Sequence, residues 1–114
     1  MHELGIAQAA LRQVAAHVSQ AGATQVHRIV LRVGELAGID IDALRFAFEI
    51  ALPASPAAGA TLEIESVAAE ARCISCGRDF SPSGEYLFEC PHCHALGANL
   101  TRGRELDLVR LELT

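Results

Sequence analysis

The chain has 114 residues, 51% of them hydrophobic and 20% charged, a balance that favours a folded core and excludes intrinsic disorder. The formal net charge is −5 and the chain contains no lysine, which argues against the basic surface of a nucleic-acid-binding protein. Aromatic residues make up only 4%, so we expect an aliphatic core with Phe46 and Phe48 as its bulky members.

The first residues lack the basic and apolar regions of a signal peptide, and no apolar run is long enough to span a membrane. These features predict a cytoplasmic protein that does not associate with membranes. In that reducing compartment, four cysteines are better suited to hold a metal than to form disulfides.

The first predicted element is a helix over residues 4–18, where apolar residues recur at helical spacing and Gly22 follows as a C-terminal cap. Residues 26–33 alternate in the pattern of a half-buried strand. A turn with two glycines then leads to a second helix, with Asp40 as its N-cap and Pro53 near its end.

Two further strands are predicted over residues 61–67 and 105–113. The last strand changes phase along its length, which indicates a β-bulge or burial on both faces. We therefore predict an α+β fold in which two helices lie on a small three-stranded sheet. Residues 1–68 and 104–114 would form this α/β domain, with residues 69–103 as an inserted, zinc-ribbon-like domain.

The inserted segment contains CISC at 73–76 and CPHC at 90–93, separated by 13 residues. Two Cys-x2-Cys knuckles allow four thiolates to surround one ion tetrahedrally, as in closed zinc sites, and iron in the same shell is the minor alternative. The predicted zinc ligands are Cys73, Cys76, Cys90 and Cys93. A full thiolate shell leaves no open position, so this zinc is expected to be structural and to hold a segment too poor in apolar residues to fold alone.

Several other polar residues are interpreted as structural. His17 and His27 lie on the first helix and first strand, and Glu35 lies in a turn. His92 and His94 flank the last cysteine and are interpreted as exposed turn residues. The alternative is that either imidazole replaces a cysteine that is lost or protonated, which would make the zinc site sensitive to pH.

Met1, His2 and Glu3 form a second candidate site. The α-amine of Met1, with an ordinary pKa of about 7.7–8.0, is readily deprotonated by a metal. The main-chain nitrogens of His2 and Glu3 follow, and the His2 imidazole can reach the same ion. Four nitrogens in one plane suit Ni(II) or Cu(II) rather than zinc. The alternative is that these residues are merely exposed, but the helix directly behind them favours a site.

Taken together, these motifs resemble the HypA family of nickel metallochaperones for hydrogenase maturation, with its HybF relatives. The resemblance covers essentially the whole chain and rests on MHEL, GELAGID, RFAFEIA, the CISC and CPHC pair, and GRELDL at 103–108. The chain departs from the pattern at Gly5, where the family often has a serine.

The resemblance implies that the protein delivers Ni(II) to the large subunit of [NiFe]-hydrogenases, together with a nickel-binding GTPase partner. By position, His2 is the essential nickel ligand, and Met1 and Glu3 complete the site. Asp40 matches an acidic position near the nickel site, and a plain helix N-cap is the equally weighted alternative. The resemblance implies nickel as the transported ion and zinc as the structural one, and it leaves a homodimer open.

No Ser/His/Asp set, phosphate-binding loop or paired-acid pattern is visible, so we expect a carrier rather than an enzyme. The main alternative is a zinc-ribbon module that binds nucleic acid or acts in regulation. The acidic balance, and the scarcity of basic and aromatic residues over 70–103, disfavour that alternative. An enzyme with an open metal site is disfavoured by the complete thiolate shell.

Overall fold

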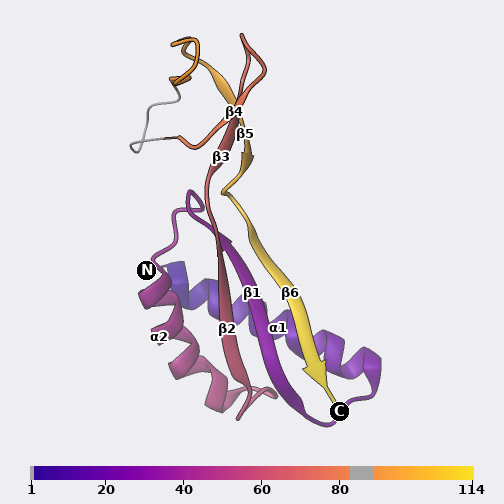
Figure 1. Ribbon diagram of the computed structural model, residues 1–114. Coiled ribbons are helices and arrows are strands. Elements are labelled where there is room, and N and C mark those ends of the chain that lie inside the picture. The colour runs from indigo at the N-terminus through magenta and orange to yellow at the C-terminus, as the bar shows by residue number, and fades with distance from the viewer. Residues whose placement is uncertain (1, 83–88) are drawn as a thin grey trace. The chain divides into compact units, whose positions relative to one another are not determined.

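The computed structural model describes residues 2–82 and 89–114, which form two compact units (Figure 1). The first unit contains both α-helices and most of a three-stranded sheet, and the second contains three short strands. The first unit comprises Met1–Arg32, Ile39–Glu65 and Asp107–Thr114, and the second comprises Val33–Gly38 and Ser66–Leu106. In the part of the chain that the structure describes, no helix combines the length and the apolar character needed to cross a membrane.

The first predicted helix is confirmed as α1 (His2–Ala21), which begins earlier than expected. Gly22 follows the last helical residue, and its φ of 64° lies in the left-handed region. The N–H of Gly22 donates to the carbonyl of Ser19, and the N–H of Ala23 donates to the carbonyl of Val18. These two bonds satisfy the last helical carbonyls in the manner of a glycine C-cap, as predicted.

The second predicted helix is confirmed as α2 (Ile41–Ala51). The Asp40 side chain accepts a hydrogen bond from the N–H of Ala43 at 3.1 Å and caps the helix as predicted. The α-helix gives way to a single 3-10 turn, η1 (Leu52–Ala54), because Pro53 lacks the N–H that a further α-helical turn would need.

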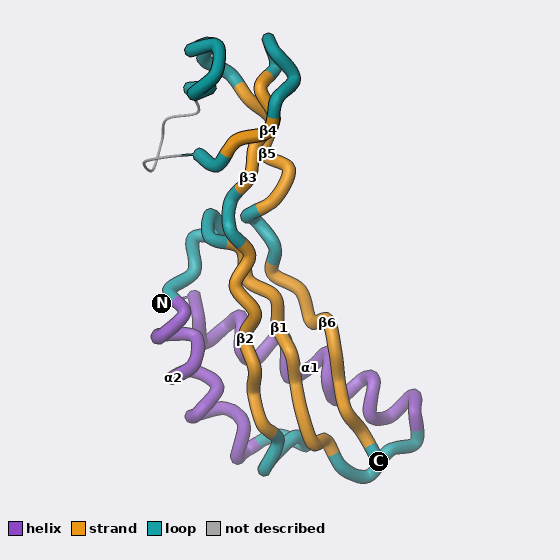
Figure 2. The backbone as a smooth tube through the Cα atoms, viewed as in Figure 1, coloured by secondary structure: helices purple, strands orange, loops and turns teal. Residues whose placement is uncertain are grey.

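The three predicted strands form one sheet in the order β2-β1-β6 (Figure 2). Their bounds are β1 (Val26–Gly34), β2 (Thr61–Val67) and β6 (Leu106–Leu113). The predicted strand over residues 26–33 is confirmed as β1, but its burial is greater than expected, because Val30 is buried as well as Ile29 and Leu31. β1 is the central strand, so both of its edges are paired and side chains of β2 and β6 flank it on each face.

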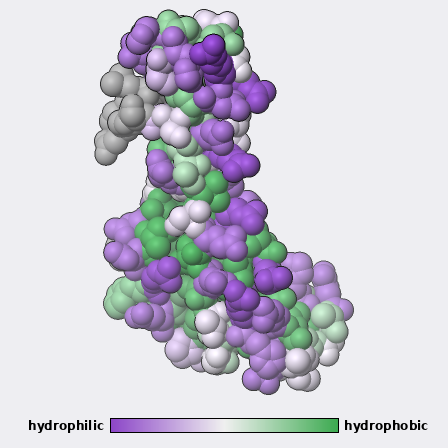
Figure 3. All heavy atoms as spheres, viewed as in Figure 1, coloured by the Kyte–Doolittle hydropathy of each residue, from purple (hydrophilic) through white to green (hydrophobic). Residues whose placement is uncertain are grey.

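Ion pairs cross the sheet beside Val30 and help to cover it. Arg28 pairs with Glu63 of β2 and, at 2.9 Å, with Glu112 of β6. Arg32 pairs with Glu65 of β2 at 3.2 Å. These pairs are partly or fully exposed, so each contributes little to stability, but the long side chains shield apolar surface. Hydrophilic residues are accordingly spread over the region of these strands (Figure 3).

The core of the first unit lies between the helices and the sheet. Leu44 and Phe48, one helical turn apart on α2, are 0% and 1% exposed. Phe46 is 59% exposed, so its predicted place in the core is wrong. Phe46 is two positions from each of these residues, about 200° around the helix, which places it on the opposite side. The other buried hydrophobic residues of this unit are Ala7, Leu11, Val14, Val26, Ile29, Val30, Leu31, Ala47 and Ala57.

The second unit contains a small sheet that the sequence did not predict. Its strands are β3 (Glu70–Cys73), β4 (Asp79–Phe80) and β5 (Ala98–Arg102), in the order β4-β3-β5. Both pairings are antiparallel, with Ala71 opposite Phe80 on one side and opposite Leu100 on the other. β3 and β5 alternate polar and apolar residues over only four and five positions, and β4 has two residues, so the pattern is too short to identify these strands in the sequence.

Three stretches of main chain meet closely within the second unit. A Cβ atom on Gly34 would overlap the main chain of Gly103, and one on Gly103 would lie 2.9 Å from the Cα of Ala69. The N–H of Glu35 donates to the carbonyl of Val67 at 2.8 Å. The N–H of Gly34 donates to the carbonyl of Glu105 at 2.7 Å, and the N–H of Leu36 donates to the carbonyl of Gly103 at 2.6 Å. The two glycines open the GELAGID and GRELDL motifs, so both are needed for this close approach.

Candidate metal sites

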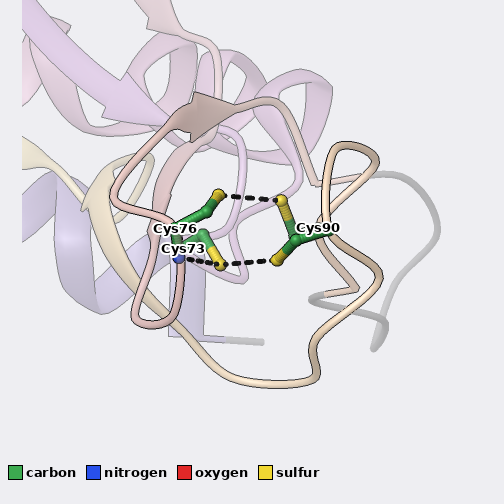
Figure 4. Close-up of side chains that lie close together, drawn as sticks. Cys73, Cys76 and Cys90 are labelled. Carbon is green, nitrogen blue, oxygen red and sulfur yellow. Dashed lines mark hydrogen bonds between the residues drawn. The ribbon is translucent and has the colours of Figure 1, made fainter.

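The four predicted zinc ligands come together at one point. The sulfur atoms of Cys73, Cys76, Cys90 and Cys93 all lie within 4.8 Å of one another. Cys73 and Cys93 are 3.5 Å apart, and Cys76 and Cys90 are 3.6 Å apart. In Figure 4 the labelled cysteines point their sulfur atoms toward a common centre. Four soft donors at these separations suit zinc, with Zn–S bonds of about 2.3 Å.

The two knuckles have the same main-chain design. In the first, the N–H of Gly77 donates to the carbonyl of Cys73. In the second, the N–H of His94 donates to the carbonyl of Cys90. Both turns end on a left-handed residue, with a φ of 75° for Gly77 and 62° for His94. Because His94 shares this left-handed conformation, its main chain has a structural task independent of its imidazole.

Main-chain N–H groups point at the buried sulfurs and favour thiolates. The N–H of Cys76 donates to the sulfur of Cys73 at 3.4 Å and is the main cause that lowers the pKa of Cys73 to about 6. For Cys90, burial opposes ionisation, but the N–H groups of Cys93 and His92 outweigh it and lower the pKa. The N–H of Ala95 also favours the Cys93 thiolate. The neighbouring sulfurs and burial prevail there, and they raise the pKa of Cys93 to about 11.

This distribution of pKa values describes a cluster that needs a cation. One thiolate forms readily, and the last is resisted because like charges cannot gather without compensation. A divalent ion supplies that compensation and allows all four sulfurs to bind as thiolates. The donor set therefore fits zinc, and the four thiols are free of disulfides. His92 and His94 are exposed, as predicted.

The first turn of α1 holds the second candidate site. Glu3 is 8% exposed and is the one charged residue that is buried among those described. Its carboxylate accepts a hydrogen bond from the main-chain N–H of Asp40 at 3.5 Å and lies 3.5 Å from the Nε2 atom of His2. The His2 side chain is 63% exposed and accessible from solvent. Glu3 and His2 thus lie together, beside the start of α2.

Two features of this turn suit a nitrogen-rich metal site. The N–H groups of the first helical turn have no partner within the helix, so those of His2 and Glu3 are available. The buried Glu3 carboxylate holds negative charge beside the exposed imidazole. Asp40 lies close through its main chain, while one of its carboxylate oxygens is engaged in capping α2. The predicted ligand Met1 lies outside the described residues.

The remaining polar candidates lie elsewhere. His27 is exposed, and its Nε2 atom is 2.8 Å from the hydroxyl of Thr114. Glu35 is exposed in the turn after β1, and His17 is exposed on α1. Sequence reasoning missed the burial of Glu3, because it depends on the approach of Asp40 from 37 residues away. The glutamate in the first helical turn was the only local signal.

Comparison with known proteins agrees with this architecture. Residues 1–113 match the family model described as "Hydrogenase/urease nickel incorporation, metallochaperone, hypA". The chain is 41% identical over 112 residues to hydrogenase maturation factor HypA from Chloroflexus aggregans, with 98% of each chain covered. It is 42% identical over 113 residues to the factor of the same name from Synechococcus elongatus, with 99% of each chain covered.

Two solved structures have the same fold over nearly the whole chain. The solution structure of the Ni metallochaperone HypA from Helicobacter pylori is 27% identical, with a TM-score of 0.70 and coverage of 99% of this chain and 97% of that one. A second HypA solution structure gives a TM-score of 0.74 at 27% identity, covering 100% and 97%. The predicted α+β fold with its cysteine-bound insertion is thereby confirmed. The chain belongs to the HypA family of nickel-incorporation metallochaperones that act in hydrogenase maturation.

Proposed function

We propose that this protein carries one Ni(II) ion on the first turn of α1 and transfers it to the large subunit of a [NiFe]-hydrogenase. The observation that carries the proposal is the pairing of an exposed His2 imidazole with a buried Glu3 carboxylate beside unpaired helical N–H groups. The ligands we assign are His2, Met1 through its amine, and Glu3. A site on an exposed helical turn can be reached directly by a receiving protein.

The cysteine cluster serves a different purpose in this proposal. We assign Cys73, Cys76, Cys90 and Cys93 as ligands of one structural zinc ion, on the basis of their mutual distances. Residues 69–103 then form the zinc-binding domain, and residues 1–68 with 104–114 form the nickel-binding domain. Because the thiolate shell is complete, the zinc has no open position for chemistry, and the protein acts as a carrier rather than an enzyme.

The partners follow from the direction of transfer. A nickel-binding GTPase supplies or regulates the ion, and the hydrogenase large subunit receives it. Four unpaired thiols gathered for a metal support a cytoplasmic location, where cysteines stay reduced. The alternative of a nucleic-acid-binding zinc ribbon would require tight, salt-dependent binding, which the net charge of −5 opposes.

The central test is a calorimetric titration of the untagged, zinc-loaded protein with Ni(II). We expect one nickel per chain, and a His2→Ala variant should bind nickel at least about a hundredfold more weakly while keeping its zinc. The matched control is His17→Ala, which removes another exposed histidine of α1. Unchanged nickel affinity in the His2 variant would contradict the assignment.

A second variant separates the two interpretations of Asp40. Asparagine caps helices as well as aspartate does, so Asp40→Asn keeps the N-cap of α2 and removes only the charge. If the Asp40 carboxylate assists nickel binding, the variant weakens nickel binding at unchanged thermal stability. If Asp40 is a plain cap, nickel affinity stays the same. Adding residues ahead of Met1 should abolish the site, because the amine becomes an amide.

A further inference from the structure

Two short sulfur–sulfur contacts pair the four cysteines of the cluster, and both run from one knuckle to the other. The sulfur of Cys73 lies 3.5 Å from that of Cys93, and the sulfur of Cys76 lies 3.6 Å from that of Cys90. Figure 4 draws the second contact as a dashed line between two labelled residues. Each cysteine thus has its contact partner in the opposite knuckle.

Main-chain N–H groups hold the buried sulfur of each knuckle in this arrangement. The N–H of Cys76 donates to the sulfur of Cys73, and the N–H of His92 donates to the sulfur of Cys90, both at 3.4 Å. Each donor belongs to the same knuckle as its acceptor. The main chain of one knuckle therefore fixes the sulfur that a cysteine of the other knuckle contacts.

Each contact joins an accessible sulfur to a shielded one. Cys76 and Cys93 are exposed, whereas Cys73 and Cys90 are 2% and 0% exposed. A small oxidant reaches the exposed thiolates first, since susceptibility to oxidation follows thiolate character and exposure. A second thiolate beside the oxidised sulfur converts such an event into a disulfide instead of a higher oxide.

We propose that the cluster is a site of reversible oxidation by peroxides, at which two cross-knuckle disulfides, Cys73–Cys93 and Cys76–Cys90, take the place of the metal. This inference rests on the zinc assignment in the proposed function and adds a modification to that site. Four cysteines allow three connectivities. The two sulfur–sulfur contacts favour this one, because sulfurs that already lie side by side need little movement to form a bond.

Oxidation of one pair consumes one hydrogen peroxide. The exposed thiolate attacks a peroxide oxygen: an S–O bond forms, the O–O bond breaks, and the hydroxide that leaves takes a proton to become water. This sulfur loses two electrons to the peroxide and becomes a sulfenic acid. The buried thiolate then attacks the sulfenic sulfur, the S–S bond forms, and the S–O bond breaks to release a second water after protonation. Two peroxides thus convert four thiolates to two disulfides, and Zn²⁺ leaves without a change in its own oxidation state.

The connectivity decides what happens to the fold when the metal leaves. Cross-knuckle disulfides join residues 73–76 to residues 90–93, the two segments that zinc would hold together. They link positions 20 and 14 residues apart, and a disulfide stabilises a fold mainly by restricting the unfolded chain. Disulfides within each knuckle would leave the two segments unconnected. The oxidised unit is therefore expected to release zinc and keep its fold, so that reduction can restore the site.

The test is titration of the zinc-loaded, full-length protein with hydrogen peroxide, with released zinc measured by a chromogenic chelator. We expect one zinc per chain to be released by two equivalents of peroxide. Trypsin cleaves after Arg72, Arg78 and Arg102, which separates the knuckles into peptides 73–78 and 79–102. Without reductant, mass spectrometry should find these two peptides joined. Disulfides within the knuckles would let them separate.

A single equivalent of peroxide identifies which cysteines pair. The free thiols that are then alkylated in any one chain should be Cys73 with Cys93, or Cys76 with Cys90. A sulfenic-acid trap such as dimedone should label mainly the exposed Cys76 and Cys93. A Cys76→Ser variant should still join the two peptides, through Cys73 and Cys93. The matched control is Ser75→Ala, which changes the same knuckle, spares every sulfur and should behave like wild type.

The fold is followed by NMR, with chelated, reduced protein as the control because it is equally free of zinc. The oxidised protein should keep the dispersed amide resonances of residues 66–106 that the chelated protein loses, and a thiol reductant with zinc should restore the original spectrum. The proposal is overturned if the peptides separate, if sulfinic acids form instead of disulfides, if the trap labels the buried cysteines first, or if the oxidised unit unfolds. Zinc content before oxidation is a separate readout: a chain without zinc would contradict the zinc assignment, and the connectivity of its oxidised thiols would still test the pairing.

Discussion

Each of the two units of this protein is stabilised internally in a different way. The first unit has a continuous apolar core in which Leu44, Phe48 and Ile29 are completely or almost completely buried. The second unit has a cluster of four buried residues, two of which are the metal-ligand candidates Cys73 and Cys90. An apolar core stabilises the first unit by itself, whereas the second has little apolar surface to bury.

This difference matches the two metal sites. In the proposed assignment, the first unit presents an exposed nickel site, and its apolar core does not depend on that ion. The second unit would enclose zinc in four sulfurs and gain its order from it. Losing one metal is therefore expected to leave a folded carrier, and losing the other is expected to unfold a whole unit.

The largest expected effect comes from removing zinc. Structural zinc contributes about 10–16 kcal/mol in small domains, which exceeds anything the cluster of Ala71 and Phe80 can supply. Chelation, or Cys73→Ser, should collapse the dispersed amide resonances of residues 66–106 in an NMR spectrum while those of the first unit persist. Ser75→Ala, in the same knuckle but without a ligand, is the control. Retained dispersion after chelation would show that the second unit folds without metal.

The next largest effect is expected at Gly34, and it tests whether the stability of the second unit depends on zinc alone. Gly34→Ala would force a Cβ atom into the main chain of Gly103 and should lower the free energy of unfolding by about 3 kcal/mol. Gly38 is a control in the same segment: its φ of 75° is positive, unlike that of Gly34, but nothing lies within 4 Å of its Cβ position. Gly38→Ala should cost only about 1 kcal/mol. If chemical denaturation shows equal losses of unfolding free energy in the two variants, the close approach of Gly34 to Gly103 is not a source of stability.

The two sites should also release their metals at different pH. Nickel should leave first, because its proposed nitrogen ligands lie on an exposed helical turn and must be deprotonated to bind the ion. For zinc, the pKa of Cys73 in the folded unit is about 6, below its ordinary 9.0. Its stabilising contribution is therefore complete above pH 9 and is lost as the pH falls through 6. Metal analysis after dialysis at stepwise lower pH checks this order, and zinc loss before nickel would refute it.

The smallest expected effect concerns Gly5 in α1. No atom outside its own helix lies within 4 Å of a Cβ built there, and its φ is not positive. Gly5→Ala should therefore raise stability by about 0.5–1 kcal/mol, by favouring the helix that carries His2 and Glu3. Gly22→Ala is a control with the opposite expected sign. Gly22 has a φ of 64° at the C-cap, so replacing it with alanine should lower stability. Thermal unfolding of the first unit measures both.

Most of the first unit could be predicted from the sequence, because its elements are long and periodic. The strand at Thr61–Val67 was predicted with its observed bounds, and the caps at Asp40 and Gly22 rest on local chemistry. Burial was harder to predict. Val30 is covered by side chains from neighbouring strands, and Phe46 lies on the solvent side of a helix whose core face is already filled.

The second unit could be predicted in its chemistry but not in its fold. Cysteine spacing identified the cluster, because two matched knuckles have few other interpretations. The strands beside it escaped detection because β4, for example, has only two residues and depends on pairing with β3. The close approach of Gly34 and Gly103 joins positions 69 residues apart, so nothing local indicates it.

Each Cys-x2-Cys knuckle has one buried cysteine and one exposed cysteine. Cys73 and Cys90 are 2% and 0% exposed, while Cys76 and Cys93 are exposed. An incoming thiol or chelator therefore meets only the second cysteine of each knuckle. If the cluster holds zinc as proposed, replacement of its ligands would begin at Cys76 and Cys93, while Cys73 and Cys90 would stay shielded from the incoming ligand.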